Sequence, residues 1–333
     1  MTAVRHVGEF DLIARWSQLV GRRSPQLVTG IGDDAAVIAC NPDADTLVTT
    51  DMLVEGVHFR TDLSTSEQLG WKSLAVSLSD VAAMGGTPTF AFISLGLPAD
   101  TPLSFADGLY RGVERCAAEF GVTVAGGDTV SAPVIVINLA LLGEAPVGRA
   151  ALRSGARPGD ALLVTGSLGN SPAGLRLLMA GRRDERFSIC LAAHLTPMPR
   201  LAEARAAVAT GAVHAMIDLS DGLSGDLRHI CKAAGVGAVI DEAALPIDEE
   251  CREAAVLLGL DPVDLALSGG EDYELLMAVA PDAASRVISA VAATGGARAT
   301  CIGVIQPGDV TIRRATGCLA PLEPRGWEHF GRG

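Results

Sequence analysis

Short apolar runs alternate with amphipathic helical patterns along almost the whole chain, and this alternation limits the fold more than any other feature. Apolar runs at 90–97 and 134–142, for example, flank a helical pattern over 104–120 that stops at Gly121. Alternation of this kind predicts sheets that are covered by helices, which is an α/β fold.

The length of the chain predicts more than one folding unit. A chain of 333 residues exceeds what one hydrophobic core usually organises, so we expect two α/β domains. A stretch rich in Gly, Arg and Pro at 148–160 is the predicted junction, which places the domains at 1–148 and 149–333.

Local signals define the ends of several predicted elements. Thr65 and Gln68 have the spacing of a capping box, which predicts a helix that runs from there to Met84, where two glycines end it. The strand at 46–50 is expected to stop at Asp51, so this carboxylate would stand at a strand end. Further predicted elements are a helix at 9–20, strands at 122–125, 161–166, 214–218, 236–241, 273–280 and 301–305, and helices at 172–180, 200–210, 249–258, 283–293 and from the LSDG turn to 234.

Charge and cysteine content exclude several classes of protein. With 26 basic and 39 acidic residues the net charge is −13, which would repel nucleic acid in the absence of a basic patch. Seven widely spaced cysteines without a C-x-x-C motif indicate reduced thiols, so we expect a cytoplasmic protein. The apolar run at 134–142 is too short to cross a bilayer, and we expect no membrane partner.

Carboxylates recur in short clusters next to glycines or at the ends of apolar runs, and this is the main chemical signal. One Asp-Gly pair is usually a turn, but six clusters suggest a common crevice. Two ionised carboxylates about 4 Å apart repel by roughly 4 kcal/mol at an effective dielectric near 20, so such a crevice requires cations. Oxygen ligands without histidine or cysteine favour Mg²⁺. The clusters are GIGDDA (Asp33, Asp34), TTD (Thr49, Thr50, Asp51), LSD (Ser79, Asp80), AGGD (Asp128), IDLSDG (Asp218, Ser220, Asp221) and SGGEDYE (Glu271, Asp272).

Mg²⁺ held by a few carboxylates commonly presents a nucleotide polyphosphate to chemistry, so the clusters suggest phosphoryl transfer. Neither of the two lysines, Lys72 and Lys232, lies in a Walker A loop, and protein-kinase signatures are absent. Residues 30–35 do match G-x-G-x-x-A, the pattern of a dinucleotide site. Two carboxylates in that loop would repel a pyrophosphate, so a metal-binding loop is the preferred interpretation.

Four further residues have both a structural and a functional interpretation. His58 is either a half-buried histidine at a strand end or a group that binds a substrate phosphate. Arg153 is either a solvated charge in the junction or a phosphate ligand. Trp327 is either a core-capping aromatic or a stacking surface, and Tyr110 is equally ambiguous on its helix.

Nine motifs in this order resemble the bacterial thiamine-monophosphate kinase family, in the superfamily of aminoimidazole-ribotide synthetase-like ATP users. They are GEFDLIAR, GIGDDAA, TTDMLVEGVHF, KSLAVSLSDVAAMG, AGGDT, GRAALRSGARPGD, IDLSDGL, LSGGEDYEL and GWEHF. The resemblance implies mixed α+β sheets, an N-terminal domain that dimerises through its sheet to give a homodimer, and a C-terminal domain that completes the site for ATP and several Mg²⁺ ions.

The resemblance also implies roles for individual residues. It implies Asp34, Thr49, Thr50, Asp51, Asp80, Asp128, Asp218 and Asp221 as metal ligands, Gly127, Asp128, Arg153, Ser220 and Tyr110 as ATP contacts, and His58, Glu271 and Trp327 as contacts to thiamine monophosphate. The chain departs from the family at Ser77, where relatives often carry Asn, and at Pro172, which fits the first turn of a helix.

The implied reaction is the last step of thiamine diphosphate synthesis, in which the γ-phosphoryl group of ATP passes to thiamine monophosphate. A phosphate monoester has its second pKa near 6, so the acceptor is largely ionised at pH 7 and needs no general base. We therefore predict direct in-line transfer that is assisted by Mg²⁺. The alternatives are an aminoimidazole-ribotide or selenophosphate synthetase and a non-catalytic Mg-nucleotide-binding module. The selenophosphate reaction is disfavoured because neither Cys nor Lys precedes Gly30.

Overall fold

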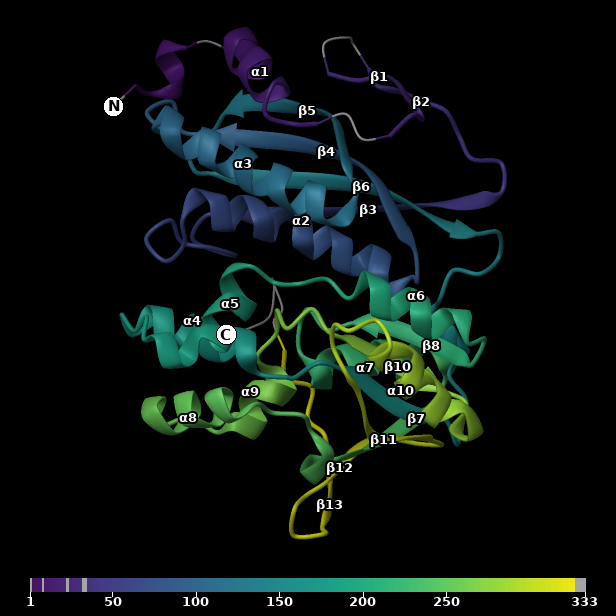
Figure 1. Cartoon of the computed structure of the whole chain (residues 1–333). Helices are drawn as coiled ribbons and strands as arrows, with labels where there is room; N and C mark the ends of the chain where they lie inside the picture. Colours follow the sequence, from purple (N-terminus) through teal and green to yellow (C-terminus); the bar gives the residue numbers. More distant parts are fainter. Residues whose placement is uncertain (1, 8, 22–23, 32–34, 327–333) are drawn as a thin grey trace. The chain divides into compact units, whose positions relative to one another are not determined.

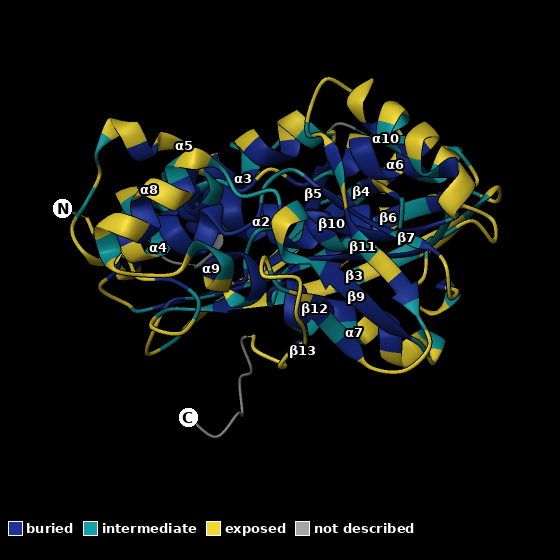
Figure 2. Ribbon diagram, turned by 90° about the horizontal axis from the view of Figure 1, so that it is seen from below, coloured by how far each residue is buried: buried dark blue, intermediate teal, exposed yellow. Residues whose placement is uncertain are grey.

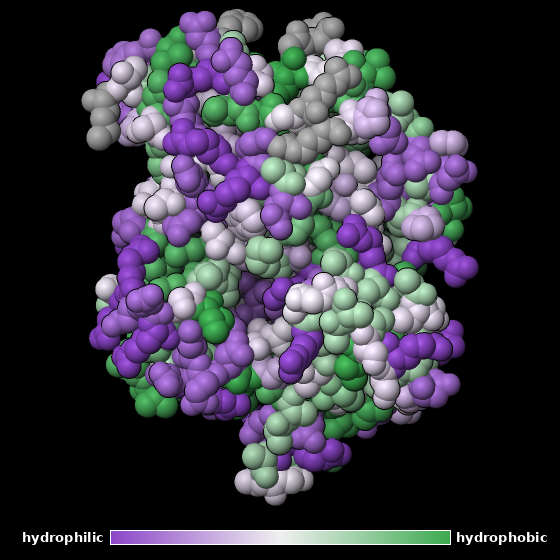
Figure 3. All heavy atoms as spheres, viewed as in Figure 1, coloured by the Kyte–Doolittle hydropathy of each residue, from purple (hydrophilic) through white to green (hydrophobic). Residues whose placement is uncertain are grey.

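The computed structural model describes residues 2–7, 9–21, 24–31 and 35–326, and they form two compact units. Unit 1 contains residues 1–81 and 87–149, and unit 2 contains residues 82–86 and 150–333. None of the helices in these described ranges is long and apolar enough to cross a membrane. Hydrophilic and hydrophobic residues are interspersed over the face seen in Figure 3.

Unit 1 is built on a four-stranded mixed sheet with the strand order β3-β6-β4-β5 (Figure 1). The strands are β3 (Ala44–Val54), β6 (Val136–Pro146), β4 (Thr87–Leu97) and β5 (Thr123–Ser131). Only the β4–β5 pair is parallel among them, and β3 and β4 both run antiparallel to β6. One face of this sheet is covered by α2 (Ser66–Ala83) and α3 (Leu103–Phe120), which lie side by side.

Two glycines allow α2 and α3 to pack closely. A Cβ atom at Gly70 on α2 would lie 2.0 Å from the carbonyl oxygen of Leu109, and one at Gly112 on α3 would lie 2.0 Å from that of Glu67. A side chain at either position would force the helices apart, so glycine is required at both. The capping box predicted at the start of α2 is confirmed, because Thr65 and Gln68 exchange backbone-to-side-chain hydrogen bonds of 3.0 and 3.2 Å.

The N-terminal segment of unit 1 packs beside α3 and one end of the sheet. It contains a short helix at Val4–His6, α1 (Glu9–Ser17) and the antiparallel pair β1 (Leu27–Thr29) and β2 (Val37–Ile38). Trp16 of α1 stacks on Tyr110 of α3 at 4.5 Å between ring centroids. Leu27 of β1 packs against Phe90 and Ala125 of the main sheet.

Unit 2 is built on a seven-stranded sheet with the order β13-β12-β9-β11-β7-β10-β8. The strands are β7 (Ala161–Thr165), β8 (Val213–Asp218), β9 (Gly237–Asp241), β10 (Leu275–Val279), β11 (Ala299–Gln306), β12 (Val310–Arg313) and β13 (Leu319–Pro321). The β9–β12 pair is parallel and the other pairs of this sheet are antiparallel.

Apolar helix faces cover the strands of unit 2, whose buried interior is visible in Figure 2. On α7 (Leu223–Ala234), Leu223, Leu227 and Ile230 recur at helical spacing and join the main core cluster. Burial of each such side chain contributes about 2 kcal/mol. The remaining helices are α4 (Asn170–Met179), α5 (Ser188–Leu195), α6 (Leu201–Ala209), α8 (Glu249–Leu258), α9 (Pro262–Ser268) and α10 (Ala284–Ala292), with 3-10 turns at Arg153–Gly155, Glu185–Phe187, Glu242–Ala244 and Pro281–Ala283.

Several predicted element boundaries are wrong, and two of them concern the site: β5 continues to Ser131 rather than ending at Ala125, and β3 continues past Asp51. Asp51 does not stand at a strand end, because β3 continues to Val54, which pairs with Val136 of β6. The continuous pairing with β6 keeps the backbone extended past the apolar run. The Asp51 side chain is accommodated within the strand because it meets a hydroxyl group on α2.

Candidate active site

Two carboxylates of unit 1 meet where β3 faces α2. Thr49 and Asp51 are two residues apart and therefore lie on the same face of the strand. The Thr49 hydroxyl donates a hydrogen bond to Oδ2 of Asp80, and Ser77 Oγ donates one of 2.6 Å to Oδ2 of Asp51. The structure thus brings together three of the predicted metal ligands, Thr49, Asp51 and Asp80.

The electrostatics of this pair are unfavourable without a cation. Burial, together with the nearby negative charge of Asp80, raises the pKa of Asp51 to about 6, although the Ser77 hydrogen bond acts in the opposite direction. The donors available here are carboxylate and hydroxyl oxygens, which are the ligands that Mg²⁺ prefers. The residues present therefore fit a magnesium ion, which would relieve the repulsion between Asp51 and Asp80.

The side chains of Thr50 and Asp128 lie on the other face of the same sheet. Thr50 Oγ1 accepts a hydrogen bond of 3.0 Å from Asn138 Nδ2. Asn138 pairs with Ser94, which in turn pairs with Asp128 on β5, so the pairing register carries all of them to one face. The structure therefore does not bring the side chains of these two predicted ligands to the Asp51–Asp80 pair.

Gly127 and Tyr110, two of the predicted ATP contacts, border one small cavity of about 50 Å³. A Cβ atom at Gly127 would lie 2.0 Å from the carbonyl oxygen of Ile93, so close packing of β5 on β4 by itself requires glycine here. Tyr110 is buried against Trp16, and burial raises its pKa to about 12. Both residues thus have a structural role in addition to any contact with nucleotide.

His58 follows β3 in a turn that fixes the orientation of its ring. The backbone N–H of Val54 donates a 3.0 Å hydrogen bond to His58 Nδ1, and His58 N donates one of 2.9 Å to the Val54 carbonyl. Because Nδ1 accepts, the neutral ring carries its proton on Nε2. An Nε2–H group can donate to a phosphate oxygen.

The predicted residues of the IDLSDG motif lie at one end of the unit 2 sheet. Asp218 is the last residue of β8 and is buried, and it pairs with Leu275 at the start of β10. Ser220 follows in the connecting loop, where its carbonyl accepts a 2.7 Å hydrogen bond from Glu271 N. This end of the sheet therefore carries Asp218, Ser220 and Glu271 on adjoining segments.

Asp226, which the sequence analysis did not single out, organises the loop that carries Asp221. Its Oδ2 atom accepts hydrogen bonds of 3.1 Å from the backbone N–H groups of both Asp221 and Gly222. Burial, together with the charges of Asp218 and Asp221, raises the pKa of Asp226 to about 7. A buried carboxylate therefore fixes the loop next to two predicted metal ligands.

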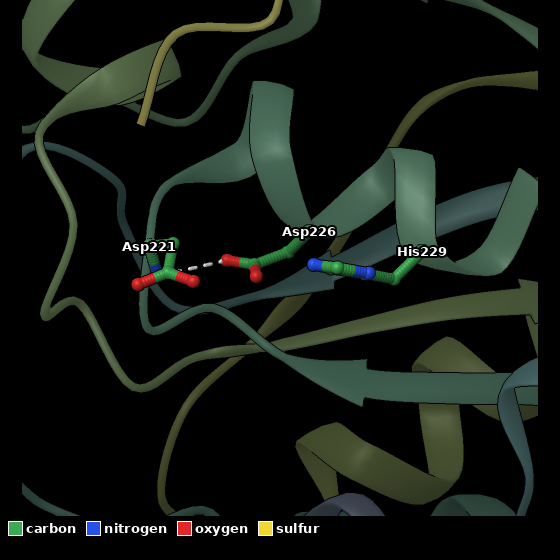
Figure 4. Close-up of side chains that lie close together, drawn as sticks. All are labelled: Asp221, Asp226 and His229. Atoms are coloured by element: carbon green, nitrogen blue, oxygen red, sulfur yellow. Dashed lines mark hydrogen bonds between the residues drawn. The ribbon is translucent and has the colours of Figure 1, made fainter. Parts of the chain in front are cut away.

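Figure 4 shows Asp221, Asp226 and His229 close together, with Asp226 and His229 projecting from α7. Within the described ranges, this is the only group of three potential ligands whose donor atoms all lie within 4.8 Å of one another. The D-x-x-H spacing places Asp226 and His229 on one face of a helix, and this spacing was the signal available in the sequence.

Glu271 lies in a segment with an unusual backbone. Glu271 and Tyr273 have φ angles of +58° and +51°, a region that non-glycine residues seldom adopt. Glu271 Oε2 lies 3.2 Å from Nδ1 of His194 on α5, and the same nitrogen lies 3.3 Å from Ser171 Oγ. The sequence analysis missed His194 because α5 itself was not predicted.

The carboxylate after Glu271 has a structural role. Asp272 accepts hydrogen bonds from the backbone N–H groups of Gly169 and Ser171 at the start of α4, at 2.9 and 3.3 Å. Burial raises its pKa to about 8 despite these bonds. It borders a polar cavity of about 290 Å³ that is also lined by Arg200 and Asp248.

The remaining predicted site residues are Arg153, Asp34 and Trp327. Arg153 lies in the 3-10 turn at 153–155 of unit 2, with an exposed side chain. Asp34 and Trp327 lie outside the described residues.

Comparison with known proteins identifies the family. Residues 32–145 match the family AIR synthase related protein, N-terminal domain, and residues 157–314 match AIR synthase related protein, C-terminal domain. A curated thiamine-monophosphate kinase of Mycobacterium tuberculosis is 42% identical over 275 residues, which cover 82% of this chain and 81% of the relative. The chain belongs to the thiamine-monophosphate kinase family.

Solved structures of thiamine-monophosphate kinases have the same fold. The crystal structure of the kinase from Stenotrophomonas maltophilia aligns with a TM-score of 0.80 at 33% identity, covering 91% of this chain and 94% of the other. The structure of AaThiL complexed with AMPPCP and TMP aligns with a TM-score of 0.78 at 34% identity, covering 99% of both chains. The resemblance drawn from the motifs and the expected two-domain fold with mixed sheets are thereby confirmed.

Proposed function

We propose that the protein is an ATP-dependent kinase that converts thiamine monophosphate to thiamine diphosphate. The observation that carries this proposal is the Asp51–Asp80 pair, two neighbouring carboxylates with hydroxyl partners in a member of this kinase family. Such a pair is suited to a divalent cation that accompanies a nucleotide. The related AaThiL complex, which contains AMPPCP and TMP, supports both ligands.

Several Mg²⁺ ions would bind to the carboxylates of both units. Asp51, Asp80 and Thr49 are the proposed ligands in unit 1, and Asp218 and Asp221 are those in unit 2. When bound, Mg²⁺ neutralises phosphate oxygens, which allows two anionic substrates to approach one another. Asp34, Thr50 and Asp128 remain proposed ligands from the resemblance.

The protein's own groups would position the two substrates. His58 would donate its Nε2–H to the phosphate of thiamine monophosphate, and Ser220, Gly127 and Arg153 would contact ATP. The acceptor phosphate is largely ionised at neutral pH, so no side chain has to remove a proton from it. We therefore propose direct in-line transfer without a phosphorylated protein intermediate.

The experiment that tests this function is incubation of the purified protein with MgATP and thiamine monophosphate, with chromatographic detection of thiamine diphosphate. Free thiamine serves as the control acceptor, because it lacks the phosphate that receives the γ-phosphoryl group. We expect one ADP for each thiamine diphosphate, and no product from thiamine. Nucleotide binding without thiamine diphosphate would refute the proposal and favour a regulatory nucleotide-binding module.

We also propose that the protein is a homodimer that associates through the sheet of unit 1. The face of β3 directed away from α2 carries Val48 and Met52, which are 70% and 55% exposed. Polar side chains such as Thr50 and Asn138 lie on the same face, but exposed apolar side chains on a sheet are typical of a surface that a second copy covers. All seven cysteines are free thiols, which supports a location in the reducing cytoplasm.

A further inference from the structure

Glu271 is held in its unusual conformation by hydrogen bonds to the neighbouring loop. Glu271 N donates to the carbonyl of Ser220 at 2.7 Å, and Tyr273 N donates to that of Leu219 at 2.9 Å. Positive φ angles at non-glycine residues cost about 1–3 kcal/mol each and persist only where surrounding contacts enforce them. The backbone therefore fixes where the Glu271 side chain begins, and contacts to its carboxylate decide where that group points.

His194 makes such a contact. Its side chain is only 9% exposed, and its Nδ1 lies 3.2 Å from Glu271 Oε2. An imidazole with its proton on Nδ1 donates to this carboxylate. Ser171 Oγ lies 3.3 Å from the same nitrogen. A Ser-His-acid triad would need the serine and the acid on different ring nitrogens, so the arrangement does not fit acyl transfer.

We propose that His194 is a positioning residue for the acceptor substrate. It holds the Glu271 carboxylate, whose side chain is 27% exposed, in the orientation that faces the positively charged thiazolium ring of thiamine monophosphate. This inference rests on the proposed function and on the contact to thiamine monophosphate that the family resemblance implies for Glu271. The ligand class is an N-quaternised heteroaromatic ring that carries a phosphate, and the contribution of His194 is specific to this ligand rather than to ATP.

Two nearly isosteric variants separate positioning from general packing. In His194→Asn the side-chain amide nitrogen takes the place of Nδ1, whereas in His194→Gln it takes the place of Nε2. We expect His194→Asn to keep the KM for thiamine monophosphate within about threefold of the wild type and His194→Gln to raise it about tenfold, with the KM for ATP unchanged in both, since a hydrogen bond to a charged group contributes about 1.5 kcal/mol or more.

A double-mutant cycle and a matched histidine complete the test. Adding His194→Gln to Glu271→Gln should not raise the KM for thiamine monophosphate further, because the carboxylate that His194 orients is already absent. His214 is the control, since its Nδ1 also contacts a carboxylate of unit 2, Asp160, at 2.9 Å. His214→Gln should lower the melting temperature and leave the KM for thiamine monophosphate unchanged.

The outcomes of this test separate the inference from the proposed function. Equal KM values in the Asn and Gln variants, or a matching rise in the KM for ATP, would overturn the role of His194 while thiamine diphosphate still forms. A wild-type protein that shows no binding of thiamine monophosphate by calorimetry would overturn the proposed function and this inference together.

Discussion

Ser77 Oγ on α2 donates a 2.6 Å hydrogen bond to Oδ2 of Asp51 on β3. Ser77 is fully buried, so this hydroxyl is part of the interior rather than of a solvated surface. The bond stabilises the ionised form of Asp51, against the opposing effects of burial and of Asp80. Ser77 therefore helps to keep Asp51, a proposed metal ligand, charged at neutral pH.

Removal of this hydroxyl should weaken Mg²⁺ binding. A hydrogen bond to a charged group contributes about 1.5–3 kcal/mol, so Ser77→Ala should raise the Mg²⁺ concentration for half-maximal rate about tenfold. The control is Ser73→Ala, which removes a buried hydroxyl on the same helix that bonds to the Gly70 carbonyl instead. An unchanged Mg²⁺ requirement in Ser77→Ala would show that Mg²⁺ binding by Asp51 does not depend on the Ser77 hydroxyl.

The raised pKa of Asp51 predicts how stability depends on pH. Its pKa is about 6 in the folded protein and 3.8 in the reference state, so the folded state retains a proton to higher pH. The associated stability is fully present below pH 4 and is lost as pH rises through 6, by about 3 kcal/mol in total. Thermal unfolding without metal should therefore show a lower melting temperature at pH 7.5 than at pH 5.

Asp51→Asn should reduce the loss of stability that occurs as pH rises, since an amide does not ionise. Mg²⁺ should raise the melting temperature of the wild type more at pH 7.5 than at pH 5, and should raise that of Asp51→Asn less at either pH. Identical pH profiles for the two proteins without metal would reject this assignment of the Asp51 environment.

Asp226 should be needed for turnover, although no role was predicted for it. Asp226→Ala leaves the N–H groups of Asp221 and Gly222 without their acceptor, which costs about 1–3 kcal/mol for each group that water does not reach. We expect at least a tenfold loss of thiamine diphosphate formation and a higher Mg²⁺ requirement. Asp261→Ala, which removes an N-cap from α9, should lower stability by about 1 kcal/mol and leave the Mg²⁺ requirement unchanged.

A charge on the face of β3 that is directed away from α2 should dissociate the proposed homodimer. In Met52→Asp an ionised carboxylate would have to be buried at the interface, which is costly without a partner. Sedimentation should then show a monomer with an unchanged circular dichroism spectrum. The matched control is Val256→Asp on α8, a valine that is 79% exposed. A monomeric wild type, or a Met52→Asp protein that remains dimeric, would exclude this interface.

The sequence predicted local elements better than the faces on which their side chains lie. The ends of α3 and α8 could be predicted because glycines at 121 and 259 adopt the left-handed conformation that ends a helix. The extension of β3 past Asp51 could not be predicted, because it depends on pairing with β6, which is distant in the chain. Long-range pairing of this kind leaves no local signal.

The same limit applies to the candidate site. The motifs named Asp51 and Asp80, but only the sheet register separates Thr49, which faces α2, from Thr50, which faces away. Asp226 was missed because it lies outside the carboxylate clusters, and His194 was missed because α5 was not predicted. Their roles follow from hydrogen bonds to the backbone of Asp221 and to the side chain of Glu271, which form only in the folded protein.

The Mg²⁺ dependence of thiamine diphosphate formation, compared between wild type and Asp51→Asn at saturating ATP and thiamine monophosphate, tests the proposed metal site most directly. We predict that the wild-type rate keeps rising after all ATP carries Mg²⁺, because further ions bind to the protein's carboxylates. We predict that Asp51→Asn remains folded and loses at least about 100-fold in rate, the scale of one lost electrostatic contact in a transition state. A wild-type-like rate and Mg²⁺ response in Asp51→Asn would contradict the proposal that this carboxylate holds a catalytic ion.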